Sequence, residues 1–522
     1  MTSIRLLRQL PAFFLALTMV FGLAQVSRGQ AECDCAPNLV QITLVPGVNI
    51  DLIRLQYGLL IVDDLPPSTF LLRVPLGQVV ELLLQILDLD PRILVAEPAY
   101  RTETPEGLGQ MMVAAVGATK AEYEDQDVFE RLRLGDAHEH TTGEGILVAI
   151  VDTGVRANHE ALVGAISPNG IDYVDDDSNP NDTANGTDDD SDGSTDEAAG
   201  HGTIIAGIVH LVAPDAQILP IRVLNDEGQG LAFDVAQGIR YAVDQGADVI
   251  NLSLGMIEES ELIADEIERA KSYGVSIVAA AGNDDDDIGL YPARDPHTLS
   301  IAALDSLDIK ASFSNYHSTV SLSAPGDGIL GPFYNGGYAI AAGTSFSTPF
   351  VGGVMALIRA INPSLTKTHV DSLTKLAVID IYEIEENEPY IGMLGTGRVD
   401  ALLAWQLTPT VGQRGTIATP GDDALAGSIA MVAPNPSRLT HPTEIRFDRA
   451  LGAPSALRLV ITDSAGRRVR TLLAGSGETV VWDGRAEWGS RAPAGVYHAT
   501  WSLGVSPDKA ARSSPIKIVR LP

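Results

Sequence analysis

Cysteine and positive charge are scarce in this chain, and long apolar runs are confined to its start. The 522 residues include 2 cysteines, Cys33 and Cys35, which stand too close together to form a disulfide framework and leave a reactive or an intermolecular role open. Lys and Arg number 35 against 68 Asp and Glu, so the net charge of −33 argues against binding to nucleic acid phosphates. After the first thirty residues, no apolar run is long and uncharged enough to span a membrane.

The first thirty residues have the pattern of an export signal. Arg5 and Arg8 precede an apolar stretch from Leu10 to Leu23, and small residues follow it. A membrane anchor is the alternative, but the apolar stretch is shorter than the ~20 residues of a spanning helix. We therefore expect residues 1–30 to be a signal peptide and the protein to be secreted, either free or associated with the cell surface.

The middle of the chain has the pattern of an α/β domain. Between about Leu132 and Trp405, buried strands alternate with amphipathic helices, which predicts a mainly parallel sheet with helices on both faces. A chain of 522 residues is too long for one compact core, so further domains are expected beside it. We expect the α/β domain to span residues 111–406, and its clearest strands are Val148–Val151, Gln217–Val223, Val249–Leu252 and Val275–Ala281.

Two smaller modules flank this domain. Residues 31–110 contain strand-like runs around a single helical run, Leu76–Leu89, which predicts an α+β module that ends in a polar linker, Arg101–Gly109. Residues 407–428 are rich in Thr, Gly, Pro and Ala and predict a second linker. The short strands and turn signals that follow predict an all-β sandwich over residues 429–522.

Four segments of the α/β region carry side chains suited to catalysis. Asp152 ends an apolar strand and precedes a glycine turn, and His201 lies between two glycines at the start of a helical run. Ser345 follows a glycine turn into another helix, where its amide N–H points toward the space in which an oxyanion would form. Asn283 ends a buried strand, and its amide group is able to donate to the same oxygen.

Each of these residues also has a purely structural explanation. Asp152 and Ser345 suit the N-cap positions of helices, a lone histidine is usually structural, and Asn283 starts an acidic loop. All four together, in the order Asp, His, Asn, Ser on one α/β scaffold, are difficult to attribute to chance. The combination favours catalysis by a serine nucleophile.

These segments resemble the subtilisin-like serine peptidase family, whose Asp–His–Ser order they share. The resemblance covers about Leu132–Trp405 and includes Val249–Gly255, Ala324–Gly326 and Gly395–Asp400. It implies a serine endopeptidase that acts on protein or peptide substrates, and it implies no organic cofactor.

The family resemblance assigns a role to each catalytic candidate. Ser345 attacks the scissile carbonyl, His201 accepts and returns the proton, Asp152 orients His201, and Asn283 holds the oxyanion with the Ser345 amide. Two departures concern neighbours of these residues: Ile204 replaces a frequent histidine, and Phe346–Thr348 replaces smaller residues or methionine. They affect pocket shape or rate and leave the reacting groups in place.

The same resemblance places two segments along the substrate cleft. One is an extended strand that pairs with the substrate, and the other is a wall of the primary specificity pocket. They comprise Ser253, Leu254 and Gly255, and Ala280, Ala281 and Gly282, respectively. Because these walls are small and apolar, they suggest a roomy pocket without a charge requirement.

An acidic insertion precedes His201. Residues 172–197 contain ten Asp and one Glu with no Lys or Arg, and repulsion on this scale calls for cations or full solvation. The aspartate spacing matches part of a calcium loop, although Ala199 stands where an EF-hand has its bidentate Glu. We expect structural calcium, with a solvated acidic loop as the alternative; the expected ligands are Asp188, Asp190, Asp192 and Asp196.

The flanking modules also resemble known parts of secreted proteins. Residues 37–100 resemble the family's N-terminal propeptide, which blocks the cleft until it is cleaved, so the chain is expected to be a zymogen processed within Tyr100–Gly117 and inhibited by its own propeptide. The C-terminal module resembles the immunoglobulin-like domain of hook-capping proteins and of secreted sorting tails. This resemblance leaves three roles open for the module, namely contact with the cell surface, contact with the export machinery and substrate docking.

Two other function classes fit the scaffold less well. A non-catalytic calcium-binding surface or adhesion protein has no reason to retain Asp152, His201, Asn283 and Ser345 together. An esterase of another α/β type has its serine before the acid and the histidine, whereas Ser345 comes last here.

Overall fold

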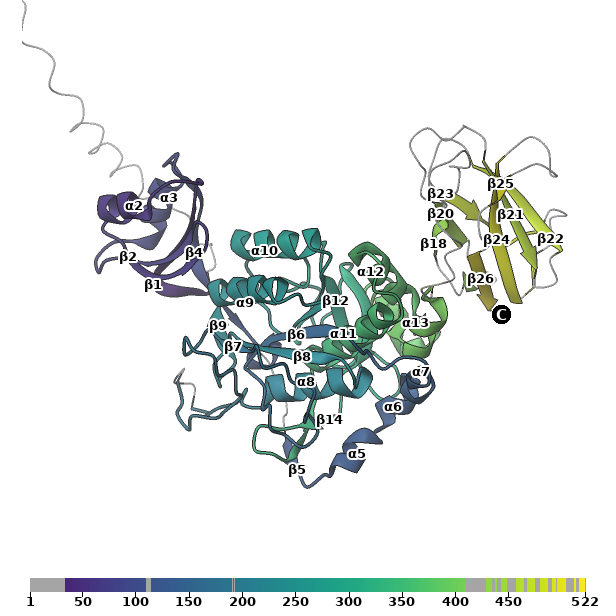
Figure 1. Cartoon of the computed structure of the whole chain (residues 1–522), viewed down its shortest axis with the longest axis horizontal. Helices are drawn as coiled ribbons and strands as arrows, with labels where there is room; N and C mark the ends of the chain where they lie inside the picture. Colours follow the sequence, from purple (N-terminus) through teal and green to yellow (C-terminus); the bar gives the residue numbers. More distant parts are fainter. Residues whose placement is uncertain are drawn as a thin grey trace, which may run out of the picture.

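The protein consists of an N-terminal α+β unit, a central α/β domain and a C-terminal β unit (Figure 1). The structure, a computed structural model, describes residues 33–108, 114–189, 191 and 193–409, together with the strands and some turns between 429 and 521. The predicted signal peptide and nearly all of the predicted linker 407–428 lie outside the described residues.

A nine-stranded sheet forms the centre of the molecule, in the order β16-β17-β13-β12-β11-β10-β6-β8-β7. Its neighbouring strands are parallel except for the pair β16 and β17. The expected α/β class is confirmed, and all four expected strands are present as β6, β8, β10 and β11. The bounds are β6 (Leu147–Asp152), β7 (Ile171–Asp172), β8 (Gln217–Arg222), β10 (Val249–Leu252), β11 (Ser276–Ala280), β12 (Leu299–Leu304), β13 (Val320–Pro325), β16 (Val378–Ile379) and β17 (Arg398–Val399).

Helices cover both faces of this sheet, as expected. On β10, Val249 belongs to the apolar cluster that contains α8 (His201–Val212) and α11 (Thr344–Ile361). Ile250 and Leu252 belong to the opposite cluster, with α9 (Ala232–Asp244) and α10 (Glu261–Ser272). Figure 1 shows α9 and α10 on one side of the strands and α8 on the other. The strands are therefore buried on both faces, which explains their nearly continuous apolar sequences.

The remaining helices and short strands of the domain lie around this centre. They are α5 (Lys120–Glu124), α6 (Asp127–Arg131), α7 (Leu134–His138), α12 (Lys367–Leu376), α13 (Ala401–Leu407), the 3₁₀ helix η1 (Glu385–Tyr390), and the small sheet of β5 (Ala114–Val116), β14 (Ile329–Pro332) and β15 (Tyr338–Ala341). Among the described residues, α11 is long and apolar enough to span a membrane, but 89% of it is buried in the domain, so it is a core helix.

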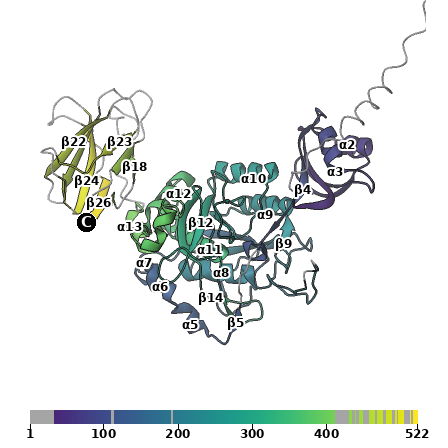
Figure 2. The ribbon, with the colours of Figure 1, turned by 180° about the vertical axis from the view of Figure 1, so that it is seen from behind.

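The N-terminal unit packs one face of its sheet on its own helices and the other on the α/β domain. The helices α2 (Ile50–Tyr57) and α3 (Val80–Leu87) cover one face, and Leu71 and Ala99 of the other face join the cluster of α9 and α10. Figure 2 shows α2 and α3 on the side away from the central domain. The sheet has the order β2-β3-β1-β4-β9, with β1 (Cys35–Leu44), β2 (Leu60–Leu65), β3 (Thr69–Arg73), β4 (Ile93–Glu103) and β9 (Gln229–Leu231).

Two expectations for this unit are wrong. The sequence predicts a single helix, but α2 is a second one, fixed by Asn49, whose side chain accepts from Asp51 N, and by Gly58 at φ 74°. The stretch Arg101–Gly109 is not a linker, because β4 extends through Arg101–Glu103 and pairs with β9 of the α/β domain. Edge pairing with a distant strand has no signature in the local sequence.

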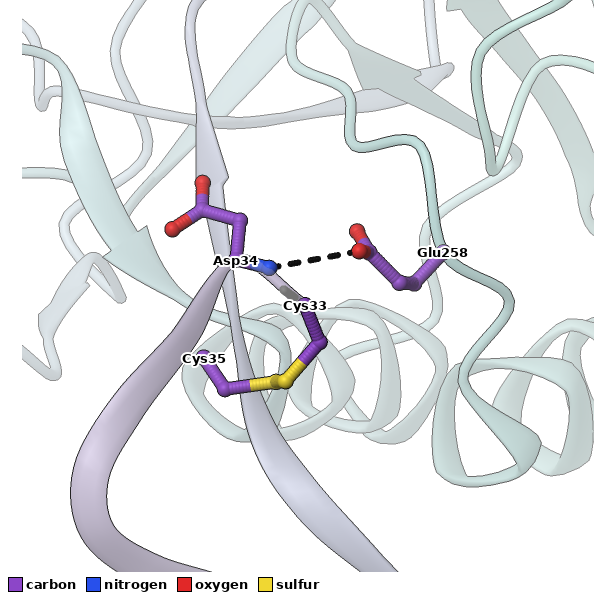
Figure 3. Close-up of a disulfide and its surroundings, with 4 residues drawn as sticks. All are labelled: Cys33, Asp34, Cys35 and Glu258. Carbon is purple, nitrogen blue, oxygen red and sulfur yellow. Dashed lines mark hydrogen bonds between the residues drawn. A yellow bond between two sulfur atoms is a disulfide. The ribbon is translucent and has the colours of Figure 1, made fainter. Parts of the chain in front are cut away.

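The two cysteines form a disulfide with each other (Figure 3), a role that the sequence left undecided. Their Cα atoms lie 5.4 Å apart, within the usual range for a disulfide. Asp34 between them donates its backbone N–H to Glu258 Oε1 (3.2 Å) and accepts from Arg101 N (2.9 Å). The start of β1 is therefore held against both β4 and the α/β domain.

The C-terminal residues form two antiparallel sheets, one of three strands and one of six that also contains a parallel pair. Trp482 is buried there and donates its Nε1–H to Arg485 O (2.9 Å), while its ring lies 5.3 Å from that of Tyr497. The strands are β18 (Ile429–Ala433), β20 (Thr443–Phe447) and β23 (Thr479–Trp482) in one sheet, and β19 (Ser437–Arg438), β21 (Leu457–Asp463), β22 (Arg468–Ala474), β24 (Gly495–Leu503), β25 (Ala511–Arg512) and β26 (Ile516–Leu521) in the other.

Candidate active site

Asp152 and His201 lie side by side at one edge of the central sheet. Asp152 is the last residue of β6 and His201 the first of α8, and both side chains are almost completely buried. His201 Nδ1 lies 2.6 Å from Asp152 Oδ1, within hydrogen-bond distance. A carboxylate in this position fixes the ring orientation and stabilises a positive charge on the imidazole.

Glycine is required on both sides of His201. Gly200 has φ 98°, a conformation that other residues rarely adopt. A Cβ on Gly202 would lie 2.1 Å from Gly154 O and 3.1 Å from Asp152 Oδ1. The flanking glycines therefore allow α8 to begin in contact with the end of β6, which brings the two side chains together.

Asp182 stabilises the first turn of α8 through hydrogen bonds. Its buried carboxylate accepts from Gly200 N (2.9 Å), Thr203 N (3.1 Å) and Thr203 Oγ1 (2.6 Å). Burial raises the pKa of Asp182 to about 7, although these hydrogen bonds act in the opposite direction. Asp182 belongs to the acidic insertion, so one end of that insertion supports the helix that carries His201.

Ser345 lies near the start of α11, as expected, and Asn283 lies next to it. Asn283 Oδ1 accepts from Thr344 N (2.9 Å) and Thr344 Oγ1 (2.9 Å), which leaves the Asn283 Nδ2 group directed into the site. The ring of Phe346, one of the departures from the family pattern, lies 5.2 Å from the imidazole of His201. The structure thus brings Asp152, His201, Ser345 and Asn283 into one site.

The predicted cleft residues lie at the ends of β10 and β11. Ser253 Oγ donates to Ser345 O (2.8 Å), and Gly282 N donates to Thr344 Oγ1 (3.1 Å). Leu254, Ala280 and Ala281 are fully buried. Gly255 exchanges two backbone hydrogen bonds with Glu103, at 2.9 and 3.1 Å.

A residue not identified from the sequence, Leu290, packs against the predicted pocket walls. Cβ atoms on Gly255 and Gly282 would lie 2.8 and 3.1 Å from Leu290 Cδ1. A branched apolar side chain therefore fills space between these walls. The expectation of a roomy pocket without a charge requirement stays a prediction.

Residues 101–108, which we call the cleft segment, run along the residues predicted to line the substrate cleft. Arg101–Glu103 pairs antiparallel with β9 on one side, and Glu103 pairs with Gly255 on the other. Thr104 N donates to Gly228 O (2.9 Å), and the short helix α4 (Pro105–Leu108) follows. The segment thus enters the site as a strand held between two walls.

Glu106 of the cleft segment contacts Ser345, His201 and Asn283. The Ser345 hydroxyl donates to Glu106 Oε2 (2.7 Å), which also lies 3.2 Å from His201 Nε2. Asn283 Nδ2 donates to Glu106 Oε1 (3.1 Å). Burial would by itself lower the pKa of His201, but Asp152 and Glu106 together raise it to about 10.

The expected calcium ligands are described only in part. Asp190 and Asp192 lie outside the described residues. Asp188 Oδ2 accepts from Gly193 N (3.1 Å), and Asp196 accepts from Asn185 N (2.8 Å) and Gly186 N (3.0 Å). In the part of the chain that the structure describes, no three His, Cys, Asp or Glu side chains gather closely enough to hold a metal ion. Carboxylate oxygens are nevertheless the donors that Ca²⁺ prefers.

Comparison with known proteins finds relatives of the central domain. A family model described as the subtilase family matches residues 143–390. Thermitase of Thermoactinomyces vulgaris is 39% identical over 239 residues, which is 44% of this chain and 80% of thermitase. The halolysin-like extracellular serine protease Nep of Natrialba magadii is 31% identical over 304 residues, covering 56% of this chain and 53% of that protein.

A solved structure also shares the fold. It is described as proteases from Pseudoalteromonas arctica PAMC 21717, and it is 28% identical with a TM-score of 0.50. The similarity covers 56% of this chain and 100% of that chain.

Proposed function

Because this chain belongs to the subtilase family and is a serine endopeptidase, we propose that Ser345 is its nucleophile, His201 its general base and Asp152 the residue that orients His201. The observation that carries this assignment is the buried pair of Asp152 and His201, 2.6 Å apart, beside a serine at the start of a helix.

The proposed reaction begins when a substrate replaces the cleft segment. Ser345 Oγ attacks the scissile carbonyl carbon as His201 Nε2 takes the hydroxyl proton. The carbonyl oxygen becomes an oxyanion that accepts from Asn283 Nδ2 and the Ser345 amide. His201 then returns the proton to the leaving amine, and a water molecule, deprotonated by His201, releases the acyl group from Ser345.

Protein or peptide substrates bind as extended strands in this proposal. The support is the cleft segment, whose Arg101–Thr104 backbone pairs with β9, Gly228 and Gly255. A substrate making the same backbone hydrogen bonds would bind with little dependence on sequence, and side-chain preference would come from the pocket beside Ser253–Gly255, Ala280–Gly282 and Leu290.

We propose that the N-terminal unit inhibits the α/β domain of the same chain. The protein would then be secreted as a zymogen and processed within Tyr100–Gly117. Two observations support inhibition. The cleft segment occupies the site, and Glu97 accepts from Ser260 Oγ (2.7 Å), Glu261 N (3.0 Å) and Leu262 N (3.3 Å) at the start of α10. Secretion is supported by the leader sequence and by the similarity to Nep, an extracellular serine protease.

Hydrolysis of casein that is lost after treatment with a fluorophosphonate tests the proposed mechanism. The labelled peptide should contain Ser345. A label on any other residue would contradict the assignment of the nucleophile. The alternative of a non-catalytic adhesion protein is disfavoured, because the relatives of this domain are described as a thermitase and as proteases.

We further propose that calcium stabilises the acidic insertion. The ligands would be Asp188, Asp190, Asp192 and Asp196. Chelation is expected to lower the melting temperature of the intact Ser345→Ala chain by several degrees, because unscreened carboxylates would repel one another. Differential scanning calorimetry with calcium, with chelator and with magnesium measures this.

The matched control for calcium is a chain in which Asp188 and Asp196 are both replaced by asparagine, whose melting temperature should no longer depend on calcium. An unchanged melting temperature of the parent chain on chelation would leave the solvated acidic loop as the better description.

We also propose that residues 429–522 are an immunoglobulin-like sandwich and that this sandwich mediates contact with the cell surface or the export machinery. The support is their two antiparallel sheets and the buried Trp482. A chain ending at residue 409 is expected to hydrolyse casein normally but to move from the cell-surface fraction to the medium. Equal distribution of both chains would contradict this role.

A further inference from the structure

The side chain of Glu106 touches every reacting group of the proposed mechanism except Asp152. One carboxylate oxygen, Oε2, accepts from the Ser345 hydroxyl at 2.7 Å and lies 3.2 Å from His201 Nε2. The other, Oε1, accepts from Asn283 Nδ2 at 3.1 Å. This side chain is 10% exposed, so little water competes for these contacts.

The first consequence concerns the general base. Both ring nitrogens of His201 face a carboxylate oxygen, with Asp152 Oδ1 2.6 Å from Nδ1 and Glu106 Oε2 3.2 Å from Nε2. Two negatively charged carboxylates at these distances stabilise the positive charge of an imidazolium, which carries a proton on each ring nitrogen. An imidazolium has no free lone pair and therefore is unable to take the proton of Ser345.

The second consequence concerns the oxyanion. Asn283 Nδ2 is the side-chain donor that the proposed function assigns to the developing negative charge. It is already bound to Glu106 Oε1, a negatively charged oxygen. Glu106 Oε1 also packs on Gly343, where a Cβ would lie 2.1 Å away. The carboxylate thus takes the place in which a substrate oxyanion would be stabilised.

We propose that Glu106 is an autoinhibitory latch, whose carboxylate keeps the intact chain inactive by occupying the oxyanion site and by holding His201 in its protonated form. The proposal rests on the proposed function of Ser345, His201 and Asn283. It goes beyond the general inhibitory role of the N-terminal unit, because it assigns the latency to one side chain.

The latch also explains why the cleft segment is not cleaved by Ser345 while it lies in the active site. The backbone of the cleft segment is paired on both sides as a substrate would be, up to Thr104. At Pro105 it turns into α4, and the contact with Ser345 is then made by the Glu106 side chain. Self-processing therefore requires that Glu106 first leaves the site.

The charges around His201 support a stable imidazolium. Asp152 of β6 and Glu106 of α4 face the ring. Asp182 accepts from Gly200 N, next to His201 in the chain. Burial alone would lower the pKa of His201, but the first two carboxylates raise it to about 10. The ion pair of Glu106 and His201 is therefore expected to persist through neutral pH.

Replacement of Glu106 with glutamine tests the latch, because glutamine keeps the shape and removes the charge. The full-length chain is refolded from denaturant at pH 7, and fluorophosphonate labelling of the full-length band is followed before processing. We expect labelling and self-processing of Glu106→Gln to be at least tenfold faster than in wild type. Glu81→Gln, which removes the same charge from the exposed first turn of α3 in the N-terminal unit, should behave as wild type.

The processed enzymes separate this proposal from the proposed function. After complete processing, wild type and Glu106→Gln should hydrolyse casein equally, since Glu106 no longer occupies the site. If both processed enzymes are active but the intact chains label at equal rates, the latch is wrong and the proposed function stands. If neither chain labels or cleaves casein in any form, the proposed function itself is wrong.

A second variant keeps the test decisive should Glu106→Gln fail to fold. Glu106→Asp retains the charge but is too short to span the distances to Ser345, His201 and Asn283 together. Folding of each variant is verified from cooperative thermal unfolding in the Ser345→Ala background. Faster labelling of Glu106→Asp supports the latch, and labelling at the wild-type rate overturns it.

Discussion

Replacement of Ser345 with alanine is expected to lower kcat for casein hydrolysis by about a million-fold, the loss that follows removal of the nucleophile in a triad of this kind. The reason is that the Ser345 hydroxyl donates to Glu106 Oε2, the same oxygen that lies 3.2 Å from His201 Nε2, so this serine lies next to the proposed general base. Casein hydrolysis and fluorophosphonate labelling measure the effect. Self-processing should stop as well, so that the chain remains at full length.

The matched control is Ser347→Ala, two residues further along α11. Ser347 Oγ donates to Ala324 O (3.2 Å), so its loss should cost about 1 kcal/mol of stability and leave kcat nearly unchanged. A Ser345→Ala enzyme that still hydrolyses casein at a tenth of the wild-type rate would exclude Ser345 as the nucleophile.

Replacement of Asp152 with asparagine is expected to lower kcat by about 10⁴-fold, because the amide does not hold His201 in the tautomer that accepts the serine proton. The fold should survive, since asparagine has the same shape. Asp248→Asn is a suitable control, because Asp248 Oδ2 accepts from Leu147 N at the opposite end of β6 (3.1 Å). Its kcat should stay within about twofold of wild type, whereas a similarly small loss for Asp152→Asn would contradict the orienting role.

The same substitution should change the pH dependence of stability. The pKa of His201 is raised in the folded chain from 6.5 to about 10, so its contribution to stability is fully present below about pH 6.5 and is lost as the pH rises toward 10. Without the charge of Asp152 this loss should be smaller. Urea unfolding of the intact Ser345→Ala chain, with and without Asp152→Asn, measures it; equal pH profiles would show that Asp152 does not control the charge of His201.

The local sequence determined the central sheet and the positions of the candidate catalytic residues. Short-range patterns place these residues. One apolar strand ends in Asp152, two others end shortly before Ser253 and Asn283, and glycines flank His201. Parallel strands place their carboxyl ends at one edge of a sheet, so these residues meet once the sheet forms. The prediction of an α/β fold follows from the same patterns.

Only the tertiary structure decided what lies against these residues. Glu106 is 239 positions from Ser345, in a polar stretch without periodicity, and it reaches the site because β4 pairs with β9 and Glu103 with Gly255. Leu290 packs on two distant glycines in the same way. Backbone pairing and close packing between distant segments depend on which surfaces meet in three dimensions, and the local sequence carries no record of that choice.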